Sequence, residues 1–397
     1  MELYNVSSTM LYSAFILYLI ATFIFSATIR QKQSERRIKT KIGTVGISFT
    51  IIGFIAQLIY LITRWMASGN PPVSNMFEFI TFLSICMVLG FIIIYFYYNL
   101  PSLGLFALPI TLIIIAYASM FPTDIPPLVP SLQSHWLSIH VTTVALGQGI
   151  LFISLVAGLM YLIRQLNQTR HTAKNIWLEI ILYTSFLFIG FIAITTIFNG
   201  VNYNASFEFS EGNEVGITTD YLLPPIVGPN EGILLTEDVM EPWFEAPTWM
   251  QGADAGRKFN TVIWSFITGT VFYAIVRLAF RKRIGAIIQP LLKNVKPDLL
   301  DEIMYRSVAI GFPIFTLGGL IFASIWAQEA WGRFWGWDPK EVWALITWFF
   351  YAAFLHLRLS RGWHGEKSAW LAVIGYAIIM FNLIVVNLVL AGLHSYA

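Results

Sequence analysis

The chain has 397 residues, of which 57% are apolar and only 12% are charged. Soluble domains usually carry about 25% charged residues, so a water-soluble fold could not cover this much apolar surface and a lipid bilayer has to do so. The formal net charge of +2 argues against nucleic acid as the main partner. The composition therefore predicts an integral membrane protein.

The single cysteine, Cys86, lies inside an apolar run. One cysteine excludes an intramolecular disulfide and a Cys-x-x-Cys metal or redox site. The Cys-x-x-Cys-His attachment signature is also absent, so the chain does not itself carry c-type haem.

Ten apolar segments are long enough to cross a bilayer, since a spanning helix needs about 20 apolar residues. They cover residues 9–29, 43–66, 76–98, 103–121, 139–163, 178–198, 260–280, 307–327, 342–361 and 369–391. The first segment has no basic start and no small-residue cleavage site, which favours a retained helix over a signal peptide. Only residues 99–102 separate the third segment from the fourth, so the count depends most on this pair. The predicted fold class is all-α, a polytopic membrane protein with about ten transmembrane helices.

Lysine and arginine predict the orientation, because cytoplasmic loops carry an excess of them. Segments 30–41, 164–174, 281–306 and 358–367 hold most of the basic residues and alternate onto one face. We predict that this face is cytoplasmic, and ten helices then place both termini outside.

Composition divides the chain into three parts. Residues 1–198 contain six of the predicted helices and residues 260–397 contain four. Residues 199–259 are acidic and rich in Pro and Gly, and they are predicted to form a small extracytoplasmic insertion. A solvated cap over the helices explains this composition, and no function can be read from it.

Three histidines are candidates for chemistry. His140 lies at the predicted outer mouth of the fifth helix, and His394 lies just past the outer end of the tenth. His356 lies inside the ninth helix, about 20 Å from the outer surface at a rise of about 1.5 Å per residue. Intramembrane ionisable residues are costly and often functional. The histidines thus define an outer and an inner level, although interfacial positions or a hydrogen bond to a neighbouring helix would also explain them.

A dense tryptophan segment precedes the ninth helix. Five tryptophans occur in eighteen residues: Trp326, Trp331, Trp335, Trp337 and Trp343. An aromatic belt at the membrane interface explains one or two tryptophans per helix end, but not this density with Gly332 and Gly336 interleaved. Glycine lets the backbone approach a flat partner closely, and indoles offer broad apolar faces with a polar edge. The segment favours a platform for a large, planar, hydrophobic ligand.

The residues after the tryptophans have the pattern of a helix start. Asp338 is a typical N-cap, Pro339 suits the first helical position and Glu341 suits the third. We favour this capping role over a catalytic one. Arg333 and Lys340 are positive charges on the predicted outer face, where they either pair with carboxylates of a ligand or are solvated.

Several of these segments resemble those of a known family. Trp331-Gly-x-x-Trp335-x-Trp337-Asp338-Pro339 resembles the WWD motif of haem-handling proteins. Residues 132–140, 305–313, 356–365 and 392–396 resemble the segments around the other motifs of the CcsA/ResC branch of the cytochrome c synthesis machinery. The chain thus resembles a CcsA/ResC-type cytochrome c biogenesis protein.

The resemblance implies roles for the candidate residues. His140 and His394 would be the axial ligands of haem at an outer site, above a platform formed by the segment from Trp331 to Asp338. His356 would contribute to an inner haem site, whose second ligand would come from a CcsB/ResB-type membrane partner.

The resemblance also implies the reaction that the chain serves. Haem b (iron protoporphyrin IX) would be a transported substrate that enters from the cytoplasmic side. It would be presented with reduced iron to the Cys-x-x-Cys-His thiols of apocytochrome c for thioether attachment. The chain would be a subunit of a cytochrome c synthase (haem lyase) complex in a bacterial plasma membrane, with a plastid thylakoid as the alternative.

Two other hypotheses stay open at this point. One is a transporter or transferase for another flat or lipid-like hydrophobic molecule, with the tryptophans along its path. The other is a respiratory membrane subunit with permanently bound haem. The second normally needs facing pairs of histidines within helices, and only His356 is clearly predicted inside the membrane, which counts against it.

Overall fold

The computed structural model describes residues 2–27, 36–119, 121–124, 132–211, 214–247 and 255–386. In these residues ten helices are long and apolar enough to cross a membrane, which confirms the predicted all-α, polytopic architecture. The candidate ligand His394 and the end of the predicted segment 369–391 lie outside the described residues.

The chain forms two compact units, Met1–Asn167 with Ile288–Ala397, and Gln168–Ile287. These two units do not coincide with the three parts predicted from composition, and that division remains a prediction. The placement of both termini outside also remains a prediction.

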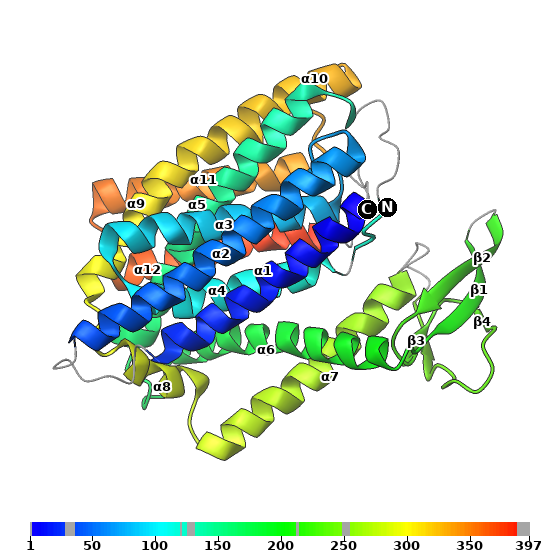
Figure 1. Cartoon of the computed structure of the whole chain (residues 1–397), viewed down its shortest axis with the longest axis horizontal. Coiled ribbons are helices and arrows are strands. Elements are labelled where there is room, and N and C mark those ends of the chain that lie inside the picture. Colours follow the sequence, from blue (N-terminus) through cyan, green and yellow to red (C-terminus); the bar gives the residue numbers. More distant parts are fainter. Residues whose placement is uncertain are drawn as a thin grey trace. The chain divides into compact units, whose positions relative to one another are not determined.

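The first unit is a helical bundle (Figure 1). Its elements are α1 (Glu2–Ala27), α2 (Arg36–Ser68), α3 (Met76–Tyr98), α4 (Pro101–Ala118), α5 (His135–Gln165), the 3₁₀ turn η3 (Gln289–Leu292), α9 (Pro297–Thr316), the π-helical turn η4 (Leu317–Phe322), α10 (Ala323–Trp331), α11 (Pro339–Arg361), α12 (Glu366–Phe381) and the π-helical turn η5 (Asn382–Val386). Helix α5 contacts α3, α9 and α12 and is the central helix of the bundle.

Helices α3 and α4 are separate, so the count at this pair is correct. Asn99 ends α3 in the left-handed conformation with φ of 49°, and its N–H donates to the carbonyl of Tyr95. Pro101 then begins α4 at a position where its missing N–H costs nothing.

The predicted span 307–327 is too short at both ends. Helix α9 begins at Pro297, inside the segment predicted to be an inner loop, and runs through η4 and α10 to Trp331. Hydropathy missed the first turns because they carry Asp301, Glu302 and Arg306. Pro297 at the first position and Asp298 in the first turn are the local signals of this helix start.

Glycines bring α5 and the α9–η4 helix into backbone contact. A Cβ atom at Gly147 would lie 2.7 Å from the backbone nitrogen of Phe315, and one at Gly318 would collide with the backbone nitrogen of Val144. Small residues allow such close approach between membrane helices. The contact therefore requires glycine at both positions.

A buried ion pair joins α2 to α3. Arg64 and Glu78 are 1% and 2% exposed, and Arg64 Nε donates to Glu78 Oε1 at 2.9 Å. The guanidinium also donates to the carbonyl of Thr123, and Glu78 Oε2 accepts from the N–H and hydroxyl of Ser74. Both charges are thus paired and hydrogen-bonded, which is the condition for burying them.

A second ion pair joins α9, α11 and α12. Arg358 binds both carboxylate oxygens of Asp301, at 2.8 and 2.7 Å, and donates to Ser368 Oγ. Asp301 also accepts from the backbone N–H of Gly365. Arg358 was counted among the basic residues of a cytoplasmic loop, but it is buried in α11 and its charge is matched inside the protein.

The second unit combines helices with a small β region. It contains α6 (Ala173–Gly200), α7 (Ala255–Phe280), α8 (Ile284–Ile288) and the strands β1 (Ala205–Glu211), β2 (Glu214–Tyr221), β3 (Val227–Gly228), β4 (Ile233–Leu234) and β5 (Phe244–Glu245). Strand β1 pairs antiparallel with β2 and β4, and β3 pairs parallel with β5. The predicted insertion therefore has a folded core, built on the buried Ala205, Phe207 and Tyr221.

Replacing Arg64 by Ala should destabilise the protein by about 3–5 kcal/mol, because it leaves Glu78 as a buried, unpaired charge. The matched control is Arg306→Ala, which removes the exposed partner of Glu302 in an i,i+4 pair and should change stability little. Unfolding in mixed detergent micelles, followed by tryptophan fluorescence, compares the two variants. Equal effects would show that burial does not decide the strength of the Arg64 pair.

Replacing Gly318 by Ala should cost about 1–3 kcal/mol of stability, because the added methyl group overpacks the contact with α5. Gly200→Ala is the control, since Gly200 is also helical and a Cβ there meets nothing within 4 Å. Thermal unfolding of the purified variants measures the difference. A Gly318→Ala protein as stable as the control would mean that the two helices separate at no cost.

Candidate functional site

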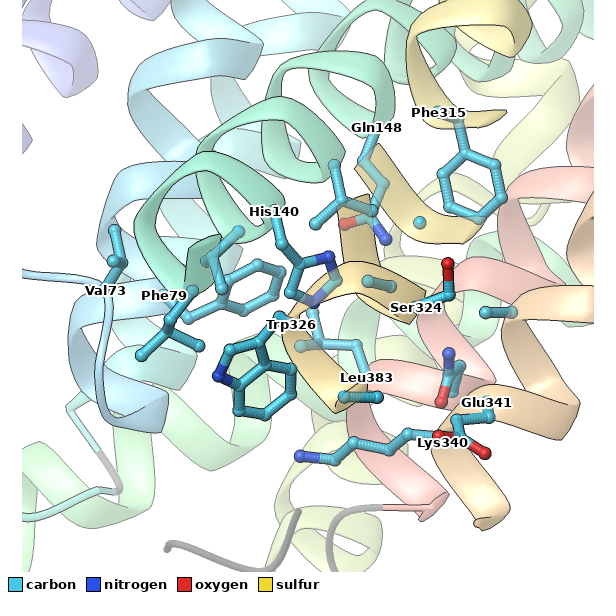
Figure 2. A pocket seen from close by; sticks show the side chains of 18 of the residues that line it. Val73, Phe79, His140, Gln148, Phe315, Ser324, Trp326, Lys340, Glu341 and Leu383 are labelled. Carbon is cyan, nitrogen blue, oxygen red and sulfur yellow. The ribbon is translucent and has the colours of Figure 1, made fainter. Parts of the chain in front are cut away.

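A cavity of about 190 Å³ opens in the first unit, between α5, η4, α10 and the start of α11 (Figure 2). The end of α12 and the segment before α3 complete its wall. Most of its lining is apolar. The polar or charged residues among those that line it are Ser74, Asn75, His140, Gln148, Ser324, Lys340, Glu341 and Asn382.

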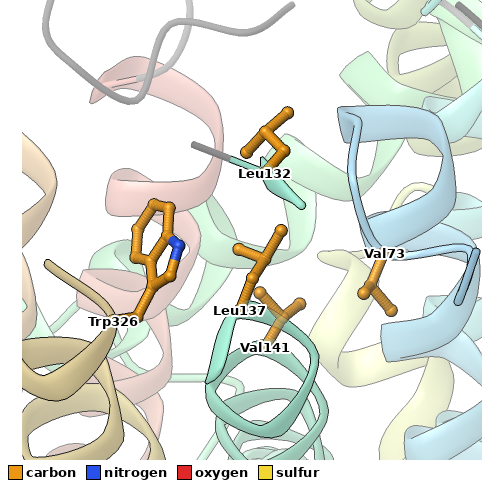
Figure 3. Close-up of a cluster of buried hydrophobic side chains, with 5 residues drawn as sticks. All are labelled: Val73, Leu132, Leu137, Val141 and Trp326. Carbon is orange, nitrogen blue, oxygen red and sulfur yellow. The ribbon is translucent and has the colours of Figure 1, made fainter. Parts of the chain in front are cut away.

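One wall of the cavity is a compact apolar cluster. It consists of Val73, Leu132, Leu137, Val141 and Trp326 (Figure 3). Trp326 is 2% exposed, and its ring packs against that of Trp331 at a centroid distance of 4.8 Å. The cluster excludes water from one side of the cavity.

Of the histidines in the described residues, His140 is the one that lines the cavity. Its Nδ1 atom lies 2.8 Å from the carbonyl oxygen of Gly318. Because a carbonyl only accepts, Nδ1 carries the hydrogen in the neutral ring and Nε2 carries the lone pair. The ring also stacks on Trp326, with centroids 5.8 Å apart and planes 8° apart. Two contacts therefore fix the orientation and tautomer of a half-buried imidazole.

The carbonyl that holds His140 belongs to the π-helical turn η4. Gly318 accepts from the N–H of Ala323, five residues on, in the π-helical pattern. Short π-helical turns inside helices occur often at functional sites. Since Gly318 lacks a side chain, α5 approaches closely enough for His140 to reach this carbonyl.

The predicted tryptophan platform is not a single surface. Trp331 ends α10 and packs against the apolar cluster, and Gly332 follows in the left-handed conformation with φ of 70°. Trp335 lines the cavity. Trp337 is 70% exposed and does not line it. Trp326, which the motif does not include, contributes the indole that stacks on His140.

The capping role predicted for Asp338 and Glu341 is confirmed. Asp338 is the N-cap of α11, and both hydrogen bonds of the capping box are present. Glu341 Oε2 accepts from the backbone N–H of Asp338 at 3.1 Å and of Gly336 at 2.7 Å. Both carboxylates are buried in this role, which shapes the loop that carries Trp335.

His356 does not line the cavity. It lies on an exposed face of α11, whereas the same helix contributes Lys340 and Ala344 to the cavity. At about 1.5 Å per residue, His356 is roughly 18 Å further along the helix axis than Ala344. The structure thus keeps the predicted outer and inner histidines apart.

Gln148 is a polar cavity residue that the sequence did not single out. It lies two helical turns from His140 on α5, and its Oε1 atom is buried without a hydrogen-bond partner among the described residues. Only its spacing of eight residues from His140 could have indicated a shared helix face. A buried polar atom of this kind needs a partner from a ligand or water.

In the part of the chain that the structure describes, no group of three or more His, Cys, Asp or Glu side chains is placed to hold a metal ion. Metal ligation in the cavity would therefore start from His140.

The sequence matches known proteins over most of its length. The model of the family described as "Cytochrome C assembly protein" matches residues 262–394. The cytochrome c biogenesis protein CcsA of Trichormus variabilis is 30% identical over 362 residues, which is 89% of this chain and 88% of that protein. CcsA of Prochlorococcus marinus is 30% identical over 88% of this chain and 82% of that protein, and CcsA of Mesostigma viride is 29% identical over 100% and 98%. This chain belongs to the CcsA family of cytochrome c biogenesis proteins.

Proposed function

We propose that this chain binds haem b in the cavity beside His140 and presents it for attachment to apocytochrome c. Membership of the CcsA family supports a role in c-type cytochrome maturation. The geometry of His140 carries the proposal. Neutral imidazole is the usual protein ligand of haem iron, and ligating histidines almost always donate their second ring N–H to a carbonyl, a carboxylate or water. His140 Nδ1 already donates to the carbonyl of Gly318, and His140 lines an apolar cavity that contains tryptophan.

The cavity has to widen to accept a porphyrin. Its volume of about 190 Å³ is below the roughly 300–1,000 Å³ of most pockets for small molecules and cofactors. Phe334 lines the cavity and is 60% exposed, so it lies at the edge where side chains can swing outward. Haem binding would therefore be coupled to movement of the segment from Phe334 to Lys340.

His394 is the proposed second axial ligand on the outer side. Asn382 and Leu383 line the cavity, and His394 follows later in the same C-terminal segment. Ligation by two histidines would enclose the iron between α5 and the C-terminus.

His356 is the proposed contribution of this chain to an inner site. His356 is exposed on a membrane-spanning helix, where a neighbouring membrane protein can reach it, and we assign the second ligand to a CcsB/ResB-type membrane partner. The complex would be a cytochrome c synthase (haem lyase) in a bacterial plasma membrane. Haem would pass outward from the His356 level to the His140 level before its vinyl groups meet the apocytochrome thiols.

Removal of the His140 imidazole tests the proposed ligand. His140→Gly should weaken haem binding by more than the roughly 10- to 100-fold typical of losing a ligand's supporting hydrogen bond. Added imidazole should restore the spectrum, because it can occupy the space that the side chain leaves. Haem titrations of the purified chain, read by absorption, measure both effects.

His135→Ala is the matched control, since His135 lies on the same helix but does not line the cavity. His394→Ala should convert a spectrum with two histidine ligands to one with a single ligand. Unchanged haem binding in the His140 variant would contradict the proposed site.

The tryptophans should differ in their effect on haem retention. Trp335→Ala removes part of the cavity wall and should lower the haem that copurifies with the chain, whereas Trp337→Ala removes an exposed side chain. Pyridine haemochrome assays on the two purified variants compare them. Equal retention would indicate that the cavity wall is not the haem surface.

A further inference from the structure

Lys340 brings a positive charge to the wall of the cavity that contains His140. It is the second residue of α11, and its side chain lies along the cavity in Figure 2. Glu341 is the acidic residue among those lining the cavity, and its carboxylate is bound to the backbone of Gly336 and Asp338. The Glu341 carboxylate is thus engaged by the backbone, and Lys340 is the positively charged residue among those that line the cavity.

The other positive charge of the same segment is placed differently. Arg333 is exposed, and its guanidinium packs over Gly336, 2.7 Å from where a Cβ atom would lie. Arg333 does not line the cavity. From the sequence, Arg333 and Lys340 could each pair with a ligand or be solvated. A ligand in the cavity would meet Lys340 and not Arg333.

We propose that Lys340 is a positioning residue that binds a carboxylate of the porphyrin and so sets the rotation of the ring about the His140–iron bond. This inference rests on the proposed function, which supplies the porphyrin. In an apolar surrounding, an ammonium group gains most from an anionic partner, and charge-assisted hydrogen bonds are the stronger ones. The positive end of the α11 helix dipole adds to the attraction.

Two attachment points make the pose of the ligand specific. Ligation by His140 alone leaves the ring free to rotate about the axial bond. A carboxylate held at Lys340 turns the propionate edge toward the start of α11. The vinyl groups, carried by the two pyrrole rings that lack propionates, then point away from α11. These vinyl groups are the ones that thioether attachment consumes.

The backbone of Lys340 is held in place by the capping box of α11. Its backbone N–H donates to Asp338 Oδ2 at 3.3 Å, within the capping box. The first turn of α11 is therefore well ordered, and substitution of the Lys340 side chain leaves the cap in place. A variant at this position should fold normally.

A comparison of two porphyrins isolates the carboxylate contact. The purified full-length chain is titrated with iron protoporphyrin IX and with its dimethyl ester, in which both carboxylates are methylated. Lys340→Met should raise the Kd for haem about tenfold, the loss expected for a hydrogen bond to a charged group, and should leave the Kd for the ester unchanged. Lys340→Arg should retain most of the affinity for haem, and Arg333→Met is the matched control that should change neither Kd.

The Kd values of the two porphyrins decide whether Lys340 binds a carboxylate. If Lys340→Met weakens both porphyrins equally, the side chain only packs in the cavity and the proposal is overturned. If it weakens neither, the proposal is overturned as well. A wild-type chain that binds neither porphyrin overturns the proposed function and the role of Lys340 with it. Haem binding that depends on His140 but not on Lys340 preserves the proposed function and rejects only this inference.

Discussion

The backbone contact between α5 and η4 is the constraint on which the candidate site depends. Gly147 and Gly318 bring the two helices so close that neither position has room for a side chain. This closeness places the carbonyl of Gly318 within reach of His140 and Trp326 beneath its ring. A wider separation would leave the imidazole free to rotate and either nitrogen free to carry the proton.

Hydrogen bonds of the capping box, rather than a helix–helix backbone contact, hold the loop between α10 and α11 at the same cavity. Glu341 gathers the N–H groups of Gly336 and Asp338, and Asp338 caps the helix in return. These bonds use up the two carboxylates of the segment and turn Trp335 and Lys340 to the cavity. Acidic residues beside a tryptophan motif thus have a structural role, and the cavity lining includes an imidazole, an ammonium, indole rings and neutral polar side chains.

Two buried ion pairs tie together the helices that carry this site. Arg64 and Glu78 join α2 to the start of α3, next to the cavity residues Ser74 and Asn75. Arg358 and Asp301 join α11 to α9 on the far side of His356 from the cavity. Paired charges buried inside the protein are costly to separate, so they hold the bundle in one arrangement while the exposed loop segment near Phe334 can still move.

The sequence by itself determined the membrane class, the number of spans, the helix start at Asp338 and the family, because hydropathy, capping and motif spacing are properties of short segments. It also identified His140 as a candidate. Only the tertiary structure decided that Trp326 rather than Trp337 faces His140, that Lys340 lines the cavity, and that Arg358 is an internal partner instead of a cytoplasmic charge. The physical reason is that these facts depend on which helix faces meet, and that follows from glycine contacts and ion pairs between residues far apart in the chain.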